Sequence, residues 1–366
     1  MYLCIRVVYV LGPLMLLAII CLSSVNAFPH PKFIYHPNHP TPLLLHDTSA
    51  NDIQNPDSAL VGEYTAFAQE LADAAADAIQ PYWRLPVKID TKTEDGRSLA
   101  QTRSPVTAAD RSAERRMRNL IEAKYPSHGI YGEEFGQVRV DADFVWVLDP
   151  IDGTKAFITG KPTFGTLIAC LYRGVPIVGI IDQCILKERW VGALGCPTSL
   201  NGKEVRVEPS ARKLEDATVY TTTPDMFRLG EELDKFEAVR DRSLRTLYGC
   251  DCYAYALVAS GFGADAVVEA DLGLYDYCAI VPVLEGAGGV ISDWRGEQLT
   301  LWNHEASEGR VVACSNAELH AQMVGILSEQ WAAGWRRRRL KRTAWQLLTL
   351  FLGIAIGASV PGRWFS

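Results

Sequence analysis

The chain has 366 residues, 48% of them hydrophobic, which is enough for one large domain or two smaller ones with a hydrophobic core. Its formal net charge of -7 and its pI of about 5.6 argue against a general nucleic-acid-binding protein, which would present a basic face, so we expect no nucleic-acid partner. The nine cysteines include no Cys-x-x-Cys pair and lie mostly in apolar runs, which indicates buried free thiols rather than a disulfide framework.

Residues 1–27 have the pattern of a secretory signal peptide. Arg6 provides a short basic start, residues 7–22 are mostly apolar, and Val25-Asn26-Ala27 fits a small-x-small cleavage site. The alternative is a membrane span, but Gly12-Pro13 interrupts the apolar run. We therefore predict a cleaved signal.

Residues 28–56 are rich in Pro and His and contain no acid before Asp47, a composition typical of transit peptides. A signal followed directly by such a leader resembles the bipartite presequence of algae whose plastids lie inside extra membranes. We therefore predict import into a complex plastid, with the secretory pathway or a membrane-anchored location as the alternative. The histidines of this leader could also suggest a metal site, but we interpret them as part of a cleaved segment.

The C-terminus combines a basic linker, residues 329–343, with the apolar segment 344–360. The 17 residues of that segment would form a helix of about 25 Å, the short limit for crossing a bilayer. It is a candidate C-terminal membrane anchor, and the flanking arginines would keep the preceding domain on the basic side of that membrane. An amphipathic surface helix is the alternative.

Residues 57–328 are expected to form the catalytic domain, and its first elements are helical. Ser58 can cap a helix whose apolar residues recur at helical spacing until Pro81 closes it. A second, highly charged helix is predicted over residues 110–124, and residues 144–148 form a continuous apolar run typical of a strand buried on both faces.

Strands and helices then alternate. We predict strands over residues 166–172 and 176–182, joined at Arg173-Gly174. Further elements are expected in the order helix 253–261, strand 266–269 and helix 277–286. This alternation favours a layered α/β architecture over a helical bundle or a β-barrel.

The most informative segment is the run 149–154, Asp-Pro-Ile-Asp-Gly-Thr, which directly follows the apolar strand. Pro150 is expected to turn the chain so that Asp149 and Asp152 point to the same side, while Gly153 and Thr154 offer backbone N–H groups to phosphate oxygens. Two neighbouring carboxylates repel each other, and divalent cations such as Mg²⁺, which prefer oxygen ligands, relieve that repulsion. The alternative is an ordinary turn with an Asp-Gly signal.

Other acids occur in similarly suggestive positions. Glu133 lies in an acidic loop between Gly132 and Gly136, where a solvated turn is the alternative. Asp110 and Asp276 each stand at a predicted helix start, where capping is the alternative, and Glu269 ends a predicted strand.

Together these motifs resemble the inositol monophosphatase family, in the family's order, over residues 58–328. The resemblance implies the alternating αβαβα sandwich of the inositol monophosphatase and carbohydrate phosphatase type. It also implies Mg²⁺-dependent hydrolysis of a small-molecule phosphate monoester by a homodimer. The positions that match the family's metal ligands are Glu133, Asp149, Ile151 (through its carbonyl), Asp152 and Asp276.

The resemblance further implies a mechanism with about two to three Mg²⁺ ions per site and no covalent phospho-enzyme. Glu133, Asp149 and the Ile151 carbonyl are expected to bind the ion that holds the attacking water, which Asp110 and Thr154 orient or deprotonate. The second ion, on Asp149 with Asp152 and Asp276, is expected to neutralise the leaving oxygen. The acids and backbone of the run 149–154 and Asp276 would also contact the substrate, as would Glu269.

Within the family, the runs 132–136, 154–162 and 249–257 most resemble the histidinol-phosphate phosphatase branch. Asp251 lies where inositol-specific enzymes carry a small apolar residue, and a carboxylate there would favour the ammonium and imidazole of histidinol phosphate over a neutral polyol. The alternative is that Asp251 caps the following helix. Competing functions are an inositol-1-phosphate phosphatase, a 3′(2′),5′-bisphosphate nucleotidase and, more distantly, a non-catalytic membrane-tethered interaction protein.

Overall fold

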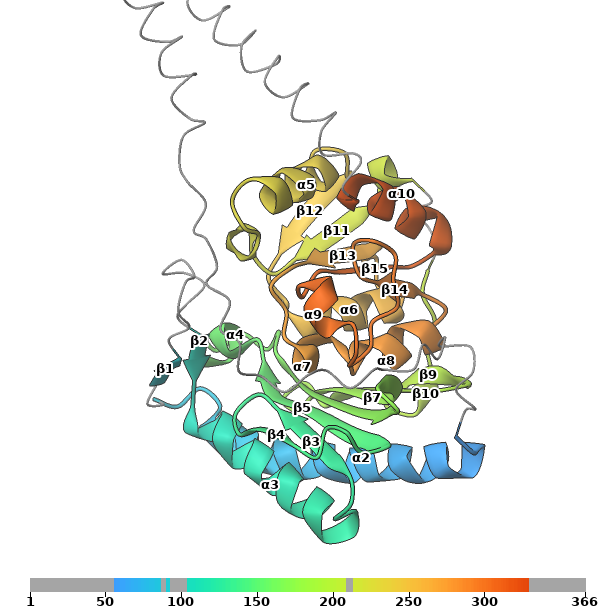
Figure 1. Ribbon diagram of the computed structural model, residues 1–366. Coiled ribbons are helices and arrows are strands. Elements are labelled where there is room, and N and C mark those ends of the chain that lie inside the picture. Colours follow the sequence, from blue (N-terminus) through green and yellow to red (C-terminus); the bar gives the residue numbers. More distant parts are fainter. Residues whose placement is uncertain (1–55, 87–89, 93–103, 209–212, 329–366) are drawn as a thin grey trace, which may run out of the picture. The chain divides into compact units, whose positions relative to one another are not determined.

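The computed structural model describes residues 56–86, 90–92, 104–208 and 213–328 (Figure 1). The predicted signal, nearly all of the leader, the basic linker and the candidate anchor lie outside these residues. Within the described ranges, no helix is both long enough and apolar enough to cross a bilayer.

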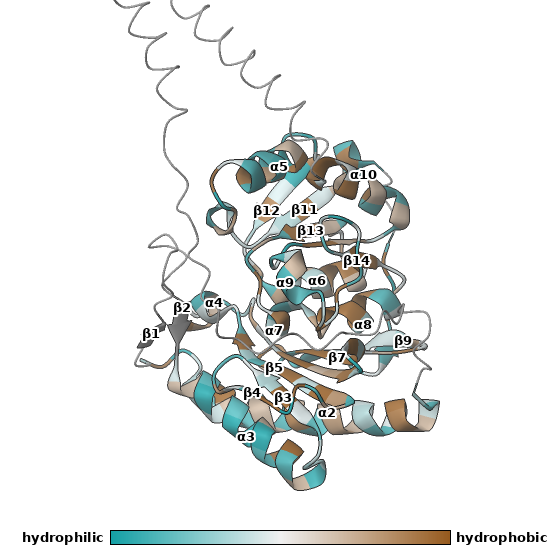
Figure 2. Cartoon of the chain, in the orientation of Figure 1, coloured by the Kyte–Doolittle hydropathy of each residue, from teal (hydrophilic) through white to brown (hydrophobic). Residues whose placement is uncertain are grey.

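Two helices form the first layer, α2 (Ser58–Ile79) and α3 (Ala108–Lys124), as the apolar spacing predicts. The predicted cap of α2 is wrong by one residue, because Asp57 precedes the helix and its carboxylate accepts a hydrogen bond from the backbone N–H of Ala59 at 3.1 Å. Both helices bury one stripe against the sheet beneath them. In Figure 2, α3 is largely hydrophilic where it faces away from the sheet.

An eight-stranded sheet forms the second layer, in the order β10-β9-β8-β7-β6-β5-β3-β4. Only β3 and β5 are parallel neighbours; all the other pairs are antiparallel. The strands are β3 (Gly129–Gly132), β4 (Gly136–Val138), β5 (Phe144–Asp152), β6 (Gly165–Tyr172), β7 (Val175–Gln183), β8 (Glu188–Ala193), β9 (Cys196–Leu200) and β10 (Lys203–Glu204).

A middle layer of helices separates this sheet from a second, five-stranded sheet (Figure 1). The helices are α6 (Cys252–Ala259), α7 (Leu274–Tyr277) and α8 (Ile280–Gly286). The second sheet has the order β12-β11-β13-β15-β14 and consists of β11 (Thr218–Thr221), β12 (Arg245–Tyr248), β13 (Ala266–Glu269), β14 (Val290–Ser292) and β15 (Val311–Cys314).

The outermost helices are α5 (Glu231–Arg240) and α10 (Ala317–Leu327), which cover the far face of the second sheet. Two short helices and a two-stranded ribbon complete the regular structure: α4 (Thr154–Ile158), α9 (His304–Ser307), β1 (Asp90–Lys92) and β2 (Ser104–Val106). Single 3₁₀ turns occupy η3 (Gln80–Tyr82), η4 (Leu214–Asp216) and η5 (Pro224–Met226). The described layers therefore alternate αβαβα, as predicted.

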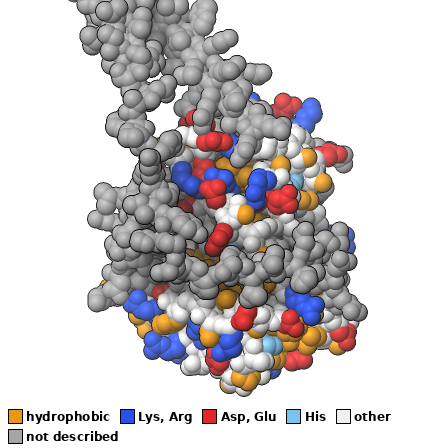
Figure 3. Space-filling model, in the orientation of Figure 1, with side chains coloured by type: hydrophobic (Ala, Val, Ile, Leu, Met, Phe, Trp, Pro, Cys, Tyr) orange, Lys and Arg blue, Asp and Glu red, His pale blue; other side chains and the backbone are white. Residues whose placement is uncertain are grey.

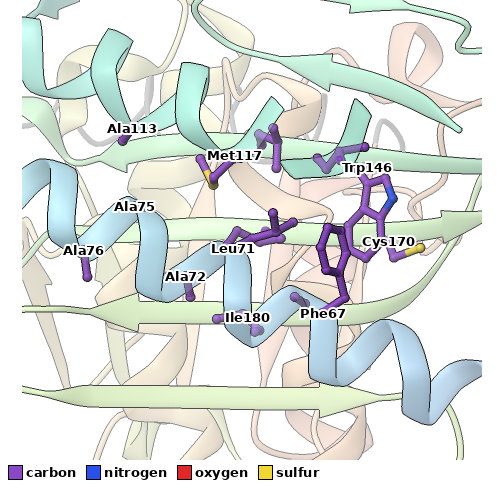
Figure 4. Close-up of a cluster of buried hydrophobic side chains, with 14 of the residues drawn as sticks. Phe67, Leu71, Ala72, Ala75, Ala76, Ala113, Met117, Trp146, Cys170 and Ile180 are labelled. Carbon is purple, nitrogen blue, oxygen red and sulfur yellow. The ribbon is translucent and has the colours of Figure 1, made fainter. Parts of the chain in front are cut away.

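The core between the first helices and the first sheet consists of closely packed apolar side chains (Figure 4). Phe67 of α2 meets Trp146 of β5 edge-on, with ring centroids 5.3 Å apart, and Leu71 and Met117 are fully buried beside them. Burying a side chain of this size contributes about 1.5–3 kcal/mol. This packing fixes β5, the strand that carries the predicted site motif.

Most cysteines of the described part are buried, and all of them are free thiols, as predicted: Cys170, Cys184, Cys196, Cys250, Cys252, Cys278 and Cys314.

Candidate active site

Strand β5 runs further than the apolar pattern predicts, to Asp152 instead of Leu148. Pro150 therefore does not end the strand. Instead, the pairing with β6 shifts register between Asp149 and Asp152. Within this irregularity, Asp149 Oδ1 accepts a hydrogen bond from the backbone N–H of Ile151 at 3.0 Å, a local turn that aspartate favours. The irregularity brings the two carboxylates, three residues apart, to the same side.

Asp276 completes a cluster of acids with Asp149 and Asp152. Each of the three offers a carboxylate oxygen that lies within 4.8 Å of the other two. Asp276 comes from α7, where its Oδ2 also accepts from the backbone N–H of Gly273 at 2.6 Å, so the helix-capping contact and the place in the cluster coexist. The cluster is the candidate metal site of the described residues.

The electrostatics of this cluster suit a bound cation. Burial and the neighbouring charge of Glu133 raise the pKa of Asp276 to about 8. Burial, together with the charges of the other acids, also raises the pKa of Asp149 and of Asp152 well above the ordinary range. A hard divalent cation with oxygen ligands removes the cause of this repulsion, so the donor set fits Mg²⁺.

Glu133 lies at the turn of the β3–β4 hairpin and lines the same cavity as the cluster. Its backbone N–H donates to Leu148 O at 3.1 Å, which ties the turn to β5. Sequence reasoning missed the residue that shapes this turn, Glu114 of α3. This fully buried carboxylate accepts hydrogen bonds from the backbone N–H groups of Glu134 at 2.7 Å and Phe135 at 3.1 Å. The sequence did contain a signal for Glu114, because this acid lies on the apolar side of an otherwise charged helix.

Asp110 and Thr154, predicted as a pair, are not hydrogen-bonded to each other. Asp110 Oδ2 accepts from the backbone N–H and the hydroxyl of Thr107, at 2.8 and 2.5 Å, in a capping box at the start of α3. Asp110 Oδ1 is buried and has no partner, and burial raises the pKa of Asp110 to about 6. The Thr154 hydroxyl lines the cavity and donates to Ile151 O at 3.0 Å.

Asp251 lies against Gly153. A Cβ at Gly153 would be 2.9 Å from Asp251 Oδ2, and Gly153 has a left-handed φ of 86°. Asp251 itself and the preceding Cys250 also have positive φ values, of 45° and 83°, which L-residues rarely adopt. The backbone is thus bent in an unfavourable conformation that places this carboxylate in the cavity.

The alternative prediction, that Asp251 caps α6, is wrong, because its side chain makes no capping hydrogen bond. Instead, the first N–H group of the helix, that of Cys252, donates to Asp152 Oδ2 at 2.5 Å. The start of α6 therefore supports the acid cluster, and the Asp251 carboxylate remains available to the cavity.

Glu269 ends β13 and is 3% exposed. Its Oε1 accepts from the backbone N–H of Thr222 and its Oε2 from the Tyr255 hydroxyl, each at 2.9 Å. Burial raises the pKa of Glu269, and these two donors oppose the increase because they stabilise the ionised form. Thr222 and Tyr255 were not predicted, since each reaches Glu269 from a different element.

The predicted residues, Asp110 apart, line one cavity of about 1150 Å³ that extends from the acid cluster past Asp251 and Glu269. Basic and acidic side chains surround its outer part: Lys155, Lys161, Arg228, Asp225, Glu305 and Glu308. A second cavity, of about 870 Å³, lies between α2 and the strands β8 and β9, and it contains no member of the acid cluster. We therefore assign the candidate active site to the first cavity.

The chain is similar to known phosphatases over most of this region. It is 50% identical over 271 residues to the bifunctional phosphatase IMPL2, chloroplastic, of Arabidopsis thaliana, covering 72% of this chain and 75% of the relative. It is 32% identical to a histidinol-phosphatase of Chlorobaculum parvum over 69% of this chain and 96% of the relative. Among solved structures, an inositol monophosphatase from Zymomonas mobilis matches with a TM-score of 0.64 and 40% identity, covering 74% of this chain and 99% of that one.

The model of the inositol monophosphatase family matches residues 61–332, well over half of the chain. The matched region contains the acid cluster, the β3–β4 turn, Asp251 and Glu269. The chain belongs to the inositol monophosphatase family and is a phosphatase, a hydrolase of phosphoric monoesters.

Proposed function

We propose that the enzyme is a Mg²⁺-dependent histidinol-phosphate phosphatase of histidine biosynthesis. The observation that carries this proposal is a pair of acids, the half-buried Asp251 and the buried Glu269, on the cavity that contains the metal-binding cluster. Within the described residues, neither acid forms a salt bridge with a lysine or arginine. Burial raises the pKa of Asp251, while Lys155 and Lys161 lower it from a longer distance. A cationic substrate would therefore be the closest positive partner of each acid. The histidinol-phosphatase among the relatives supports this choice.

The metal would be held by Asp149, Asp152, Asp276, Glu133 and the Ile151 carbonyl, with about two to three Mg²⁺ ions per site. When bound, Mg²⁺ lowers the pKa of water and neutralises charge on the phosphate ester. The residues around it have other tasks. Because the Thr154 hydroxyl donates to Ile151 O, its oxygen can still accept a hydrogen bond from the attacking water.

Hydrolysis forms a bond between the water oxygen and phosphorus and breaks the ester P–O bond, and the leaving oxygen takes a proton from solvent water to give the alcohol. We assign the orientation of the water to Thr154, and the acceptance of its proton to Asp110, whose Oδ1 has no hydrogen-bond partner. The backbone of Gly153 and Thr154 would contact the phosphate oxygens, and Gly153 leaves room for the ester because it has no side chain. No covalent intermediate is required.

The experiment that tests the substrate assignment is the replacement Asp251→Asn. Loss of this charge should lower kcat/KM for histidinol phosphate by about tenfold, which corresponds to about 1.4 kcal/mol, and should affect glycerol 2-phosphate much less. Asp225→Asn, at another acid of the same cavity, is the matched control. Equal losses on both substrates in Asp251→Asn would contradict the assignment.

For the location, we propose import into a complex plastid through residues 1–56. The presequence pattern and the word chloroplastic in the name of the Arabidopsis relative support this proposal. A fluorescent reporter fused to residues 1–56 should enter the plastid of an alga of that type. Secretion of the reporter would support the alternative.

For the assembly, we propose a homodimer, with residues 344–360 as a membrane anchor. The edge strand β12 exposes Leu247 and Tyr248, 39% and 50% of whose surfaces are accessible, and these side chains are candidates for the subunit contact. Light scattering of the detergent-extracted protein should give the mass of two chains. Recovery in the soluble fraction without detergent would contradict the anchor.

A further inference from the structure

The carboxylate of Glu269 is held on both oxygens, and both donors are neutral. Thr222 reaches it from the end of β11 through a backbone N–H group, and Tyr255 from α6 through its hydroxyl. Within the described residues, no lysine, arginine or histidine pairs with it. Hydrogen bonds from neutral donors favour the ionised form of a buried carboxylate and place no positive charge beside it, so a cation that enters the cavity is left to supply that charge.

Tyr255 is 1% exposed, and it lines the cavity. It lies one turn beyond Cys252, whose N–H group donates to Asp152 Oδ2 at 2.5 Å. One short helix, α6, thus contacts the acid cluster with its first N–H group and contacts Glu269 with the Tyr255 hydroxyl. The relative positions of the phosphate end and the cation end of the substrate would then depend on α6.

We propose that Tyr255 is a positioning residue that orients Glu269 to bind the cationic group of the substrate. The inference rests on the proposed function, because it concerns recognition of an ammonium or imidazolium group next to the phosphate. Two donors use only two of the lone pairs of the carboxylate, so the others remain available to the substrate. Without the Tyr255 hydroxyl, one oxygen of a buried carboxylate loses its donor, and the side chain is free to turn away from its binding orientation.

The test is the variant Tyr255→Phe, which removes the hydroxyl and keeps the ring that packs in the core. A hydrogen bond to a charged group contributes about 1.5 kcal/mol, so we expect the ratio of kcat/KM for histidinol phosphate to that for glycerol 2-phosphate to fall about tenfold. The loss should appear mainly in KM for histidinol phosphate. The inhibition constant of histidinol, measured against glycerol 2-phosphate hydrolysis, should rise by a similar factor.

Tyr253→Phe is the matched control on the same helix. The Tyr253 hydroxyl also donates to a glutamate, Glu188 at 2.6 Å, but neither residue lines the cavity. This variant loses a similar hydrogen bond and should keep the wild-type substrate ratio. Thermal unfolding of both variants, measured alongside, shows whether each is folded.

The outcomes separate the two proposals. If the wild-type enzyme prefers histidinol phosphate and Tyr255→Phe keeps that preference, the role of Tyr255 is wrong and the proposed function stands. If Tyr255→Phe loses activity equally on both substrates, chiefly in kcat, the role of Tyr255 is also wrong. If the wild-type enzyme shows no preference for the cationic ester, both the proposed function and the role of Tyr255 are wrong.

Discussion

At Gly153 the backbone adopts a left-handed conformation with φ 86°, and Asp251 Oδ2 lies 2.9 Å from the position that a Cβ would take. Gly153→Ala therefore adds backbone strain of about 1–2 kcal/mol and also displaces the Asp251 carboxylate. We expect kcat/KM for histidinol phosphate to fall by about 10²-fold, as displaced site groups typically cause.

Gly202→Ala is the control for this prediction. Gly202 also has a positive φ, 76°, but its Cβ would meet no atom within 4 Å. Measured by thermal unfolding, both variants should lose stability. Only Gly153→Ala should lose selectivity for the cationic ester, and an unchanged selectivity there would contradict the close contact with Asp251.

His128 is buried beneath α2, where its ring faces Tyr64. Its Nδ1 accepts a hydrogen bond from Trp146 Nε1 at 3.1 Å, and its ring stacks on Tyr125 at 4.6 Å. Burial lowers the pKa of His128, while the nearby Glu63 acts in the opposite direction. The folded protein thus favours the neutral imidazole.

Because the folded-state pKa of His128 lies below the unfolded value of about 6.5, its contribution to stability is complete above that pH and is lost as pH falls through the folded-state pKa. We therefore expect Tm to decrease on acidification across this window. In His128→Gln, whose amide oxygen can still accept from Trp146, the decrease should be smaller. The same pH dependence in both proteins would contradict this explanation.

At the scale of elements, the β3–β4 hairpin is held by α3. Glu114 accepts from two backbone N–H groups of the turn and from Arg118 Nε at 2.7 Å. Gly132 lies so close to this carboxylate that a side chain there would collide with it. Since the turn carries Glu133, the helix α3 determines where that proposed metal ligand lies.

We therefore predict that Glu114→Ala weakens Mg²⁺ activation. The Mg²⁺ concentration for half-maximal activity should rise about 10–100-fold, the range typical of residues that support metal ligands, and excess Mg²⁺ should restore part of the rate. Glu122→Ala is the matched control, because Glu122 lies on the same helix and pairs with Arg139 at the surface. Normal Mg²⁺ activation of Glu114→Ala would show that the turn holds its position without this contact.

Local sequence patterns predicted those helices and strands whose own residues show, by an apolar run or a helical period, which side chains are buried. The apolar runs around residues 166–172 and 266–269 are strands, and the periodic segment after Ser58 is a helix. The extension of β5 through Pro150 was missed because a proline normally ends a strand pairing, whereas here the register shift accommodates it. The hydrogen bond of Tyr255 to Glu269 could not be predicted either, because it joins two elements that only the folded chain brings together.

The residues proposed for the site span positions 110 to 276 and come from α3 of the first layer, from both sheets, and from the helices between the sheets. The resemblance to the family named these positions, whereas the physical pattern of the sequence brought only Asp149 and Asp152 next to each other. Acidic and basic side chains are intermixed on the face drawn in Figure 3. The proposed selectivity for a cationic ester would therefore depend on Asp251 and Glu269 in the cavity rather than on the general surface charge.

The proposed function is best tested by the rate of phosphate release by the purified enzyme, with and without Mg²⁺, from histidinol phosphate, inositol 1-phosphate and adenosine 3′,5′-bisphosphate. We predict activity that requires Mg²⁺ and a kcat/KM for histidinol phosphate at least about tenfold above the others, or about 1.4 kcal/mol in transition-state binding. An equal or higher kcat/KM for inositol 1-phosphate or for the nucleotide would contradict the assignment of Asp251 and Glu269 to a cationic substrate.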